Sequence, residues 1–105
     1  MQVREYQTDN SKKPYSNWLS HLKDRVGVSI IRSHVTRLEF GHFGNHRQVG
    51  QGVWELKIRY GPGYRVYYLR DGEQLIVLLC GGDKGDQERD IERAKTYSAD
   101  YWRRK

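Results

Sequence analysis

The most regular pattern of hydrophobic and polar positions lies between residues 53 and 80. It begins with a period of two, in which Trp54, Leu56, Ile58 and Tyr60 alternate with Val53, Glu55, Lys57 and Arg59. This alternation predicts a strand over residues 53–60 with one face turned toward a core. A Gly-Pro-Gly bend separates it from a second predicted strand at 64–70, and Asp71-Gly72 then predicts a type I′ hairpin turn. The run 74–80, QLIVLLC, is apolar on both faces and predicts a central strand.

Upstream of this sheet, apolar residues recur at helical spacing. Pro14 suits a first helical turn, and the spacing predicts two helices that meet near Gly27 as a helical hairpin. The apolar positions are Trp18, Leu19, Leu22 and Val26 in the first helix, and Ile31, His34, Val35 and Leu38 in the second. A short strand is predicted before them at 3–8, followed by a polar break at 9–13.

Two further segments complete the predicted fold. The glycine-rich stretch 41–52 predicts irregular structure, apart from a short strand at 46–49. Residues 85–103 predict a C-terminal helix that Asp86 could cap. The apolar stripe of this helix is Ile91, Ala94, Ser98 and either Trp102 or Tyr101.

Together these elements predict one α+β domain over residues 1–105, in which a helical hairpin packs on a small antiparallel sheet and a helix follows. We expect one core, formed by Trp18, Leu22, Ile31, Val35, Leu38, Leu56, Ile58, Val66, Ile76, Leu78, Ile91 and Ala94.

Charge adds an expectation about partners. The chain carries 19 Lys and Arg against 13 Asp and Glu, a formal charge of +6 that favours a polyanionic partner. A solvated basic surface without such a partner is the alternative. Cys80 has no second cysteine to pair with and is predicted to be a reduced, buried thiol. With neither a signal peptide nor a membrane-length apolar run, we expect a soluble cytoplasmic protein.

The placement of the cations suggests nucleic acid as that partner. Lys57, Arg59, Arg65 and Arg70 are predicted to lie together on the solvent-facing side of the sheet. Tyrosines at 60, 64, 67 and 68 interleave with them, and bases stack on aromatic rings while cations hold phosphates. Tyr64 and Tyr68 fall on the apolar face and are better explained by packing. We predict that Arg59, Arg70 and Tyr67 bind RNA.

Other site chemistries are not supported. Gly81-Gly82-Asp83-Lys84-Gly85 lacks the spacing of a nucleotide phosphate loop, and His21, His34, His42 and His46 form no metal signature. We therefore expect no metal and no cofactor. If the protein cleaves RNA, cations must stabilise the charged phosphorus centre, assisted by a lysine, tyrosine or carboxylate in proton transfer.

At this point the residues resemble a known family. The runs WELKIRYGPGYRVYY and VLLCGGDKGDQERDIERAKTY, with RLEFGHFGNHRQVGQGV before them, are similar to the HigB-like, phage Gp49-related branch of the RelE/ParE toxin superfamily. The resemblance implies a RelE-like fold and a toxin that cleaves mRNA in the ribosomal decoding site. It also implies a cognate helix-turn-helix, HigA-like antitoxin that binds the toxin, and an oligomer formed with it.

By motif, the resemblance assigns catalytic roles to Lys57, to Arg65 of Gly63-Tyr64-Arg65, to Lys84 of the Gly-Asp-Lys turn, and to Asp90. Three positions depart from the RelE pattern. Glu55 stands where a second lysine occurs, Lys84 replaces an arginine, and Asp90 lies near a tyrosine position. Two other functions are compatible with the resemblance, namely a ParE-like gyrase poison and an inert member that only binds its antitoxin. The cation cluster favours the nuclease.

Overall fold

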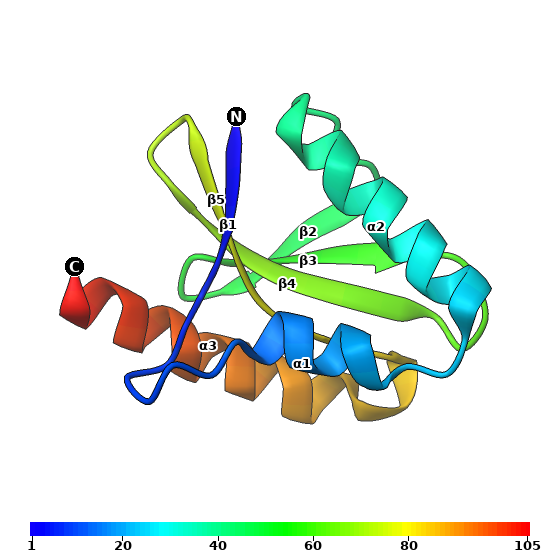
Figure 1. Cartoon of the computed structure of the whole chain (residues 1–105). Coiled ribbons are helices and arrows are strands. Elements are labelled where there is room, and N and C mark those ends of the chain that lie inside the picture. Colours follow the sequence, from blue (N-terminus) through cyan, green and yellow to red (C-terminus); the bar gives the residue numbers. More distant parts are fainter.

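The computed structural model describes residues 1–105 as three α-helices and five strands (Figure 1). In chain order they are β1 (Gln2–Glu5), α1 (Pro14–His21), α2 (Arg25–Glu39), β2 (His46–Gly50), β3 (Val53–Ile58), β4 (Tyr64–Asp71), β5 (Leu75–Gly82) and α3 (Gln87–Arg104). A single 3₁₀ turn, η1 (Lys84–Asp86), leads into α3. No helix is long and apolar enough to cross a membrane.

The five strands form one sheet in the order β1-β5-β4-β3-β2. Strands β2 to β5 are antiparallel, as the alternation in the sequence predicts, and β5 is a central strand. The prediction of an entirely antiparallel sheet is wrong at one edge, because β1 pairs parallel with β5, with Val3 opposite Ile76. The chain thus begins with a strand, and the first helix follows it.

Helices cover both faces of the sheet, and the expected single core is divided into two. On one face, residues of α1 and α2 pack with Leu56, Val66 and Ile76. On the other face, Ala94 of α3 packs with Val53, Tyr67, Leu69 and Leu79. All twelve predicted core residues belong to one of these clusters or pack against it. The prediction that the second face is open to solvent is wrong, because α3 lies over it.

Helices α1 and α2 do not form the hairpin that the spacing predicts. Helix α1 packs along β5, whereas α2 leads away from it toward β1 (Figure 1). The break between them falls at residues 22–24, before Gly27, since Asp24 caps α2 by accepting a hydrogen bond from the backbone N–H of Gly27 at 2.9 Å. Tyr64 also donates to Asp24 at 2.9 Å, which ties the start of α2 to β4.

Two local predictions need correction. The β4–β5 loop contains residues 72–74, of which only Gly72 has positive φ, so it is not a two-residue type I′ turn. A type I′ turn needs positive φ at both central residues, and Gln51-Gly52 between β2 and β3 has φ of 53° and 76°. Asp86 precedes α3 without a side-chain capping bond, and Asp83 accepts from Gly85 N at the start of η1.

Candidate functional site

Three of the four predicted catalytic residues lie where β3, β4 and β5 meet the turn into α3. In the sheet register Lys57 pairs with Arg65, and Arg65 pairs with Gly82. A β-carbon placed on Gly63 would lie 2.8 Å from Arg65 Nη1 and 3.5 Å from Lys84 Cβ. Lys57, Arg65 and Lys84 therefore gather around one end of the sheet, and we call these three residues the cation cluster.

Arg65 differs from its two neighbours in being buried, with only 3% of its surface exposed. Its Nη1 donates to the Gly63 carbonyl at 2.5 Å, and its Nε is buried without a hydrogen-bond partner. It takes part in none of the ion pairs of the chain. A buried guanidinium with unused donors and no counter-charge is suited to receive an anion, because burial without a partner is costly.

Lys57 and Lys84 supply the exposed part of the cluster. Both side chains are exposed, and neither forms an ion pair. The backbone N–H of Lys57 donates to the Asn45 carbonyl at 2.8 Å, which fixes the end of β3 against the loop after α2. The cluster therefore offers three positive charges that no carboxylate of the chain neutralises.

Asp90 lies next to the cluster, beneath the first turn of α3. A β-carbon at Gly82 would come within 1.9 Å of Asp90 Oδ2, so the carboxylate takes the space that a side chain opposite Arg65 would fill. Only glycine permits this approach. Burial raises the pKa of Asp90 above its ordinary value, although Arg93, 3.3 Å away, and Arg89 lower it in part.

A second buried carboxylate, Glu55, has a structural environment. Its Oε2 accepts from Gln87 Nε2 at 2.8 Å and from the Tyr67 hydroxyl at 3.1 Å, and its Oε1 accepts from Arg47 Nε at 2.9 Å. Burial alone would raise the Glu55 pKa, but these partners outweigh it and hold the pKa below its ordinary value. Glu55 therefore joins β2, β3, β4 and α3 and does not pair with Arg65.

The three predicted RNA-binding residues, Tyr67, Arg70 and Arg59, lie in different parts of the structure. Tyr67 has no exposed surface and lies under α3, so its ring cannot stack on a base. Arg70 lies on the opposite face from Arg65, with its guanidinium 4.8 Å from the centre of the Phe43 ring. The sequence already carried this signal, since the two arginines are five positions apart and an odd offset along a strand changes faces. Arg59, just beyond β3, is exposed near Lys57.

No group of three His, Cys, Asp or Glu side chains is placed to hold a metal ion. Cys80 is buried, as predicted, and burial raises the pKa of its thiol to about 12. A thiol of that pKa is not a nucleophile near neutral pH.

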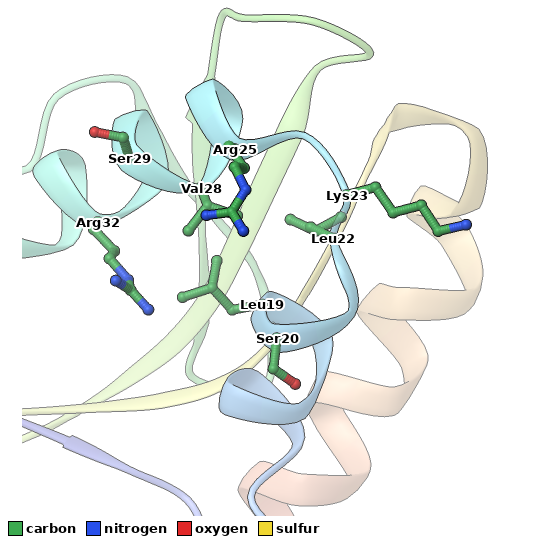
Figure 2. A pocket seen from close by; sticks show the side chains of 8 residues that line it. All are labelled: Leu19, Ser20, Leu22, Lys23, Arg25, Val28, Ser29 and Arg32. Carbon is green, nitrogen blue, oxygen red and sulfur yellow. The ribbon is translucent and has the colours of Figure 1, made fainter.

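Two of the hollows adjoin α2, and sequence reasoning identified neither. The first, of about 670 Å³, lies between α1 and α2 and is called here the α1–α2 groove. Figure 2 shows Leu19, Leu22 and Val28 around it, with Arg25 and Arg32 projecting from α2. The second, of about 580 Å³, lies between α2 and β3. The first hollow is lined by residues 19–32 alone, whereas the second joins residues 34–45 with residues 56–59.

Comparison with known proteins identifies relatives that match most of the chain. The family described as "Phage derived protein Gp49-like (DUF891)" matches residues 17–101. An uncharacterized protein of Haemophilus influenzae is 44% identical over 81 residues, an alignment that covers 77% of this chain and 82% of the relative. The matched region contains α2, the antiparallel strands and the cation cluster.

Proposed function

Because the chain belongs to the family of phage-derived Gp49-like proteins, a family associated with toxin–antitoxin modules, we propose that it is the toxin of such a module. The proposed activity is that of a HigB-like, ribosome-dependent mRNA endonuclease. The observation that carries this proposal is the cation cluster, with Arg65 buried and free of any counter-charge. Gyrase inhibition or antitoxin binding alone gives no reason for such a group.

Cleavage of RNA without a metal proceeds by attack of a 2′-oxygen on the adjacent phosphorus. The 2′-OH loses its proton as the new O–P bond forms, and the 5′-oxygen takes up a proton as its bond to phosphorus breaks. Negative charge accumulates on the phosphoryl oxygens between these events. Donors already fixed in place stabilise that charge without reorganising, and Arg65 is held by the Gly63 carbonyl and by the sheet.

Within this proposal the members of the site have different parts. The exposed Lys57 and Lys84 hold the scissile phosphate, and Arg65 directly behind them stabilises the charge that grows on its oxygens. Asp90 is the carboxyl group of the site, and burial raises its pKa above the ordinary value, which is the direction that favours proton exchange by a carboxyl group. Because Asp90 is paired with Arg89 and Arg93 whereas Arg65 has no counter-charge, we expect removal of Asp90 to affect cleavage less than removal of Arg65.

The exposed cations hold RNA but do not orient its 2′-oxygen for attack on phosphorus. A ribosome that presents a distorted codon would supply that orientation. The need for a 2′-oxygen also makes the reaction specific for RNA, because DNA lacks the internal nucleophile. The proposed partners are therefore the ribosome with its mRNA and, when the toxin is silent, an antitoxin.

The proposal is tested with purified protein on ribosomes programmed with a defined message. We expect cleavage of the bound mRNA and no cleavage of the same RNA free in solution. A message that carries one 2′-deoxynucleotide at the mapped cleavage position should resist cutting there, with the ribosome and the toxin unchanged. Equal cleavage of the deoxy-substituted position would rule out attack by the 2′-oxygen.

A further inference from the structure

The hollow between α2 and β3 is basic and contains no acid. It is lined by His34 and Arg37 of α2, by His42, Phe43 and Asn45 of the following loop, and by Arg59 beyond β3. Its remaining lining residues are Gly44, Leu56 and Lys57. A volume of about 580 Å³ falls within the usual range of small-ligand pockets. Lys57 also belongs to the cation cluster, so the hollow adjoins the proposed cleavage site.

The loop that forms one wall is fixed at both ends. Gly41 ends α2 with φ of 76°, and the N–H groups of Gly41 and His42 donate to the carbonyls of Leu38 and Arg37. This is a Schellman motif, whose left-handed position favours glycine. At the other end Asn45 accepts from Lys57 N at 2.8 Å. The hollow is therefore formed before any ligand binds.

An aromatic column supports the same wall. Phe43 stacks on His46 at 5.3 Å, His46 on Trp54 at 4.9 Å, and Trp54 on Tyr68 at 6.4 Å between ring centres. Arg70 lies against the Phe43 ring as well. The ring of Phe43 is thus held in place as an apolar wall, with Leu56 buried behind it.

From this arrangement we infer that the hollow binds one unpaired nucleotide of RNA beside the cleaved position. The base lies along the His42 imidazole and the Arg37 guanidinium, which are surfaces on which bases stack, and the Phe43 ring is the apolar wall beside it. Arg37 and Arg59 hold the flanking phosphates, and the exposed Asn45 side chain can both donate to and accept from a base edge. The inference rests on the proposed function, because that function identifies RNA as the ligand.

Chemical-shift mapping tests this inference without any cleavage. The ¹⁵N-labelled protein is titrated with adenosine, cytidine, guanosine and uridine 5′-monophosphates, and separately with inorganic phosphate and with a short oligoglutamate peptide. We expect saturable shifts at the amides of 42–45 with the nucleotides, and clearly weaker ones with phosphate or peptide. Equal affinity for phosphate or peptide, or shifts that avoid 42–45, would overturn the nucleotide assignment.

Two variants sharpen the result. Arg37→Ala and His42→Ala should each weaken nucleotide binding by about tenfold. The matched control is Arg4→Ala, which removes one exposed charge from β1, the strand at the opposite edge of the sheet, and should leave affinity unchanged. If Arg4→Ala weakens binding as much as Arg37→Ala, the effect is one of net charge and the inference fails.

The binding measurement separates this inference from the proposed function. If nucleotides shift the amides of 42–45 but the protein never cuts RNA on ribosomes, the hollow is a nucleotide site and the proposed nuclease activity is wrong. If ribosome-dependent cleavage is unchanged in Arg37→Ala and nucleotides cause no shifts, the nuclease proposal stands and the nucleotide site in the hollow is wrong.

Discussion

Arg65 is the residue on which the account depends most. A buried charge without a counter-charge opposes folding, whereas the same charge serves a reaction that builds up negative charge. Nearby carboxylates could have neutralised it, yet Glu55 is held by Arg47, Tyr67 and Gln87, and no ion pair joins Asp90 to Arg65. We infer that Arg65 serves to bind an anionic ligand.

This reading predicts the behaviour of Arg65→Ala. Cleavage on programmed ribosomes should fall by about 100- to 1,000-fold, as when one donor to a transition-state oxyanion is lost. The free energy of unfolding should change by no more than about 1 kcal/mol, because the lost hydrogen bond to the Gly63 carbonyl is offset by removal of a buried charge without a counter-charge. Arg65→Lys should restore part of the activity, since it keeps the charge but not the planar fork. A folded Arg65→Ala protein with the parental rate would refute the assignment.

Glu55 should show the opposite pattern. Glu55→Gln weakens three interactions of a buried carboxylate and should destabilise the protein by about 1–3 kcal/mol at pH 7. The folded pKa of Glu55 is depressed, so its contribution is present above its ordinary value of 4.5 and is lost as pH falls through the folded pKa. Denaturant unfolding at pH 7 and about pH 3 should therefore show the gap between parent and variant closing in acid. A gap that widens in acid would contradict the depressed pKa.

At the scale of elements, the position of α3 decides which sheet residues reach solvent. Its first turn meets the sheet at Gly82, where Asp90 takes the place of a side chain, and Gln87 reaches Glu55 from the same turn. Lys57 and Lys84, at the end of the sheet, remain exposed, while Arg65 and Tyr67 are covered. The cation cluster is thus a consequence of where this helix begins.

Gly82→Ala tests that packing. The added methyl group would displace Asp90 and should destabilise the protein by about 1–3 kcal/mol. Removing the carboxylate makes room, so Gly82→Ala combined with Asp90→Ala should be more stable than the sum of the two single effects predicts. Denaturant unfolding of the four proteins measures this coupling. Strict additivity would show that the two residues do not compete for one space.

The elements differ in how far their sequence reveals them. Local periodicity predicted β3, β4, β5 and α3, because apolar residues repeat within each of them. It did not predict the parallel pairing of β1 with β5, which joins residues more than seventy positions apart. The coverage of the second face by α3 was missed for the same reason. Glu55 and Arg65 were predicted to face solvent because they are polar, although both are buried and Glu55 is held by Gln87 of α3.

The candidate site follows the same division. Motif spacing brought Lys57, Arg65 and Lys84 together correctly in space, since the strand pairing that joins the first two is local. Their catalytic roles stay a prediction. The contact between Glu55 and Gln87 spans 32 positions, and no local pattern announces it.

At the scale of the whole molecule, the net charge of +6 favours binding of an acidic partner. The α1–α2 groove has an apolar floor and three cations around it, Lys23, Arg25 and Arg32, with no acid among its lining residues (Figure 2). We propose that an acidic, amphipathic segment of the helix-turn-helix antitoxin docks there, its apolar side on Leu19, Leu22 and Val28. Such binding would leave the cation cluster at the end of the sheet a separate surface.

This proposal predicts salt-dependent binding of the antitoxin encoded beside the toxin gene. Arg25→Ala or Arg32→Ala should slow association and weaken the dependence of its rate on salt, whereas Arg4→Ala should change neither. Surface plasmon resonance at several salt concentrations provides both quantities. An association rate that ignores salt, or one equally slowed by Arg4→Ala, would place the contact elsewhere.

The central claim is that the protein silences translation by cutting mRNA on the ribosome. Mapping RNA 5′ ends across the transcriptome after brief induction tests it most directly, with Arg65→Ala expressed to the same level as the control. We predict new ends inside translated messages, in register with the reading frame, that are absent from untranslated RNA and from the Arg65→Ala culture. Growth arrest without such ends, or ends equally frequent in untranslated RNA, would contradict the account.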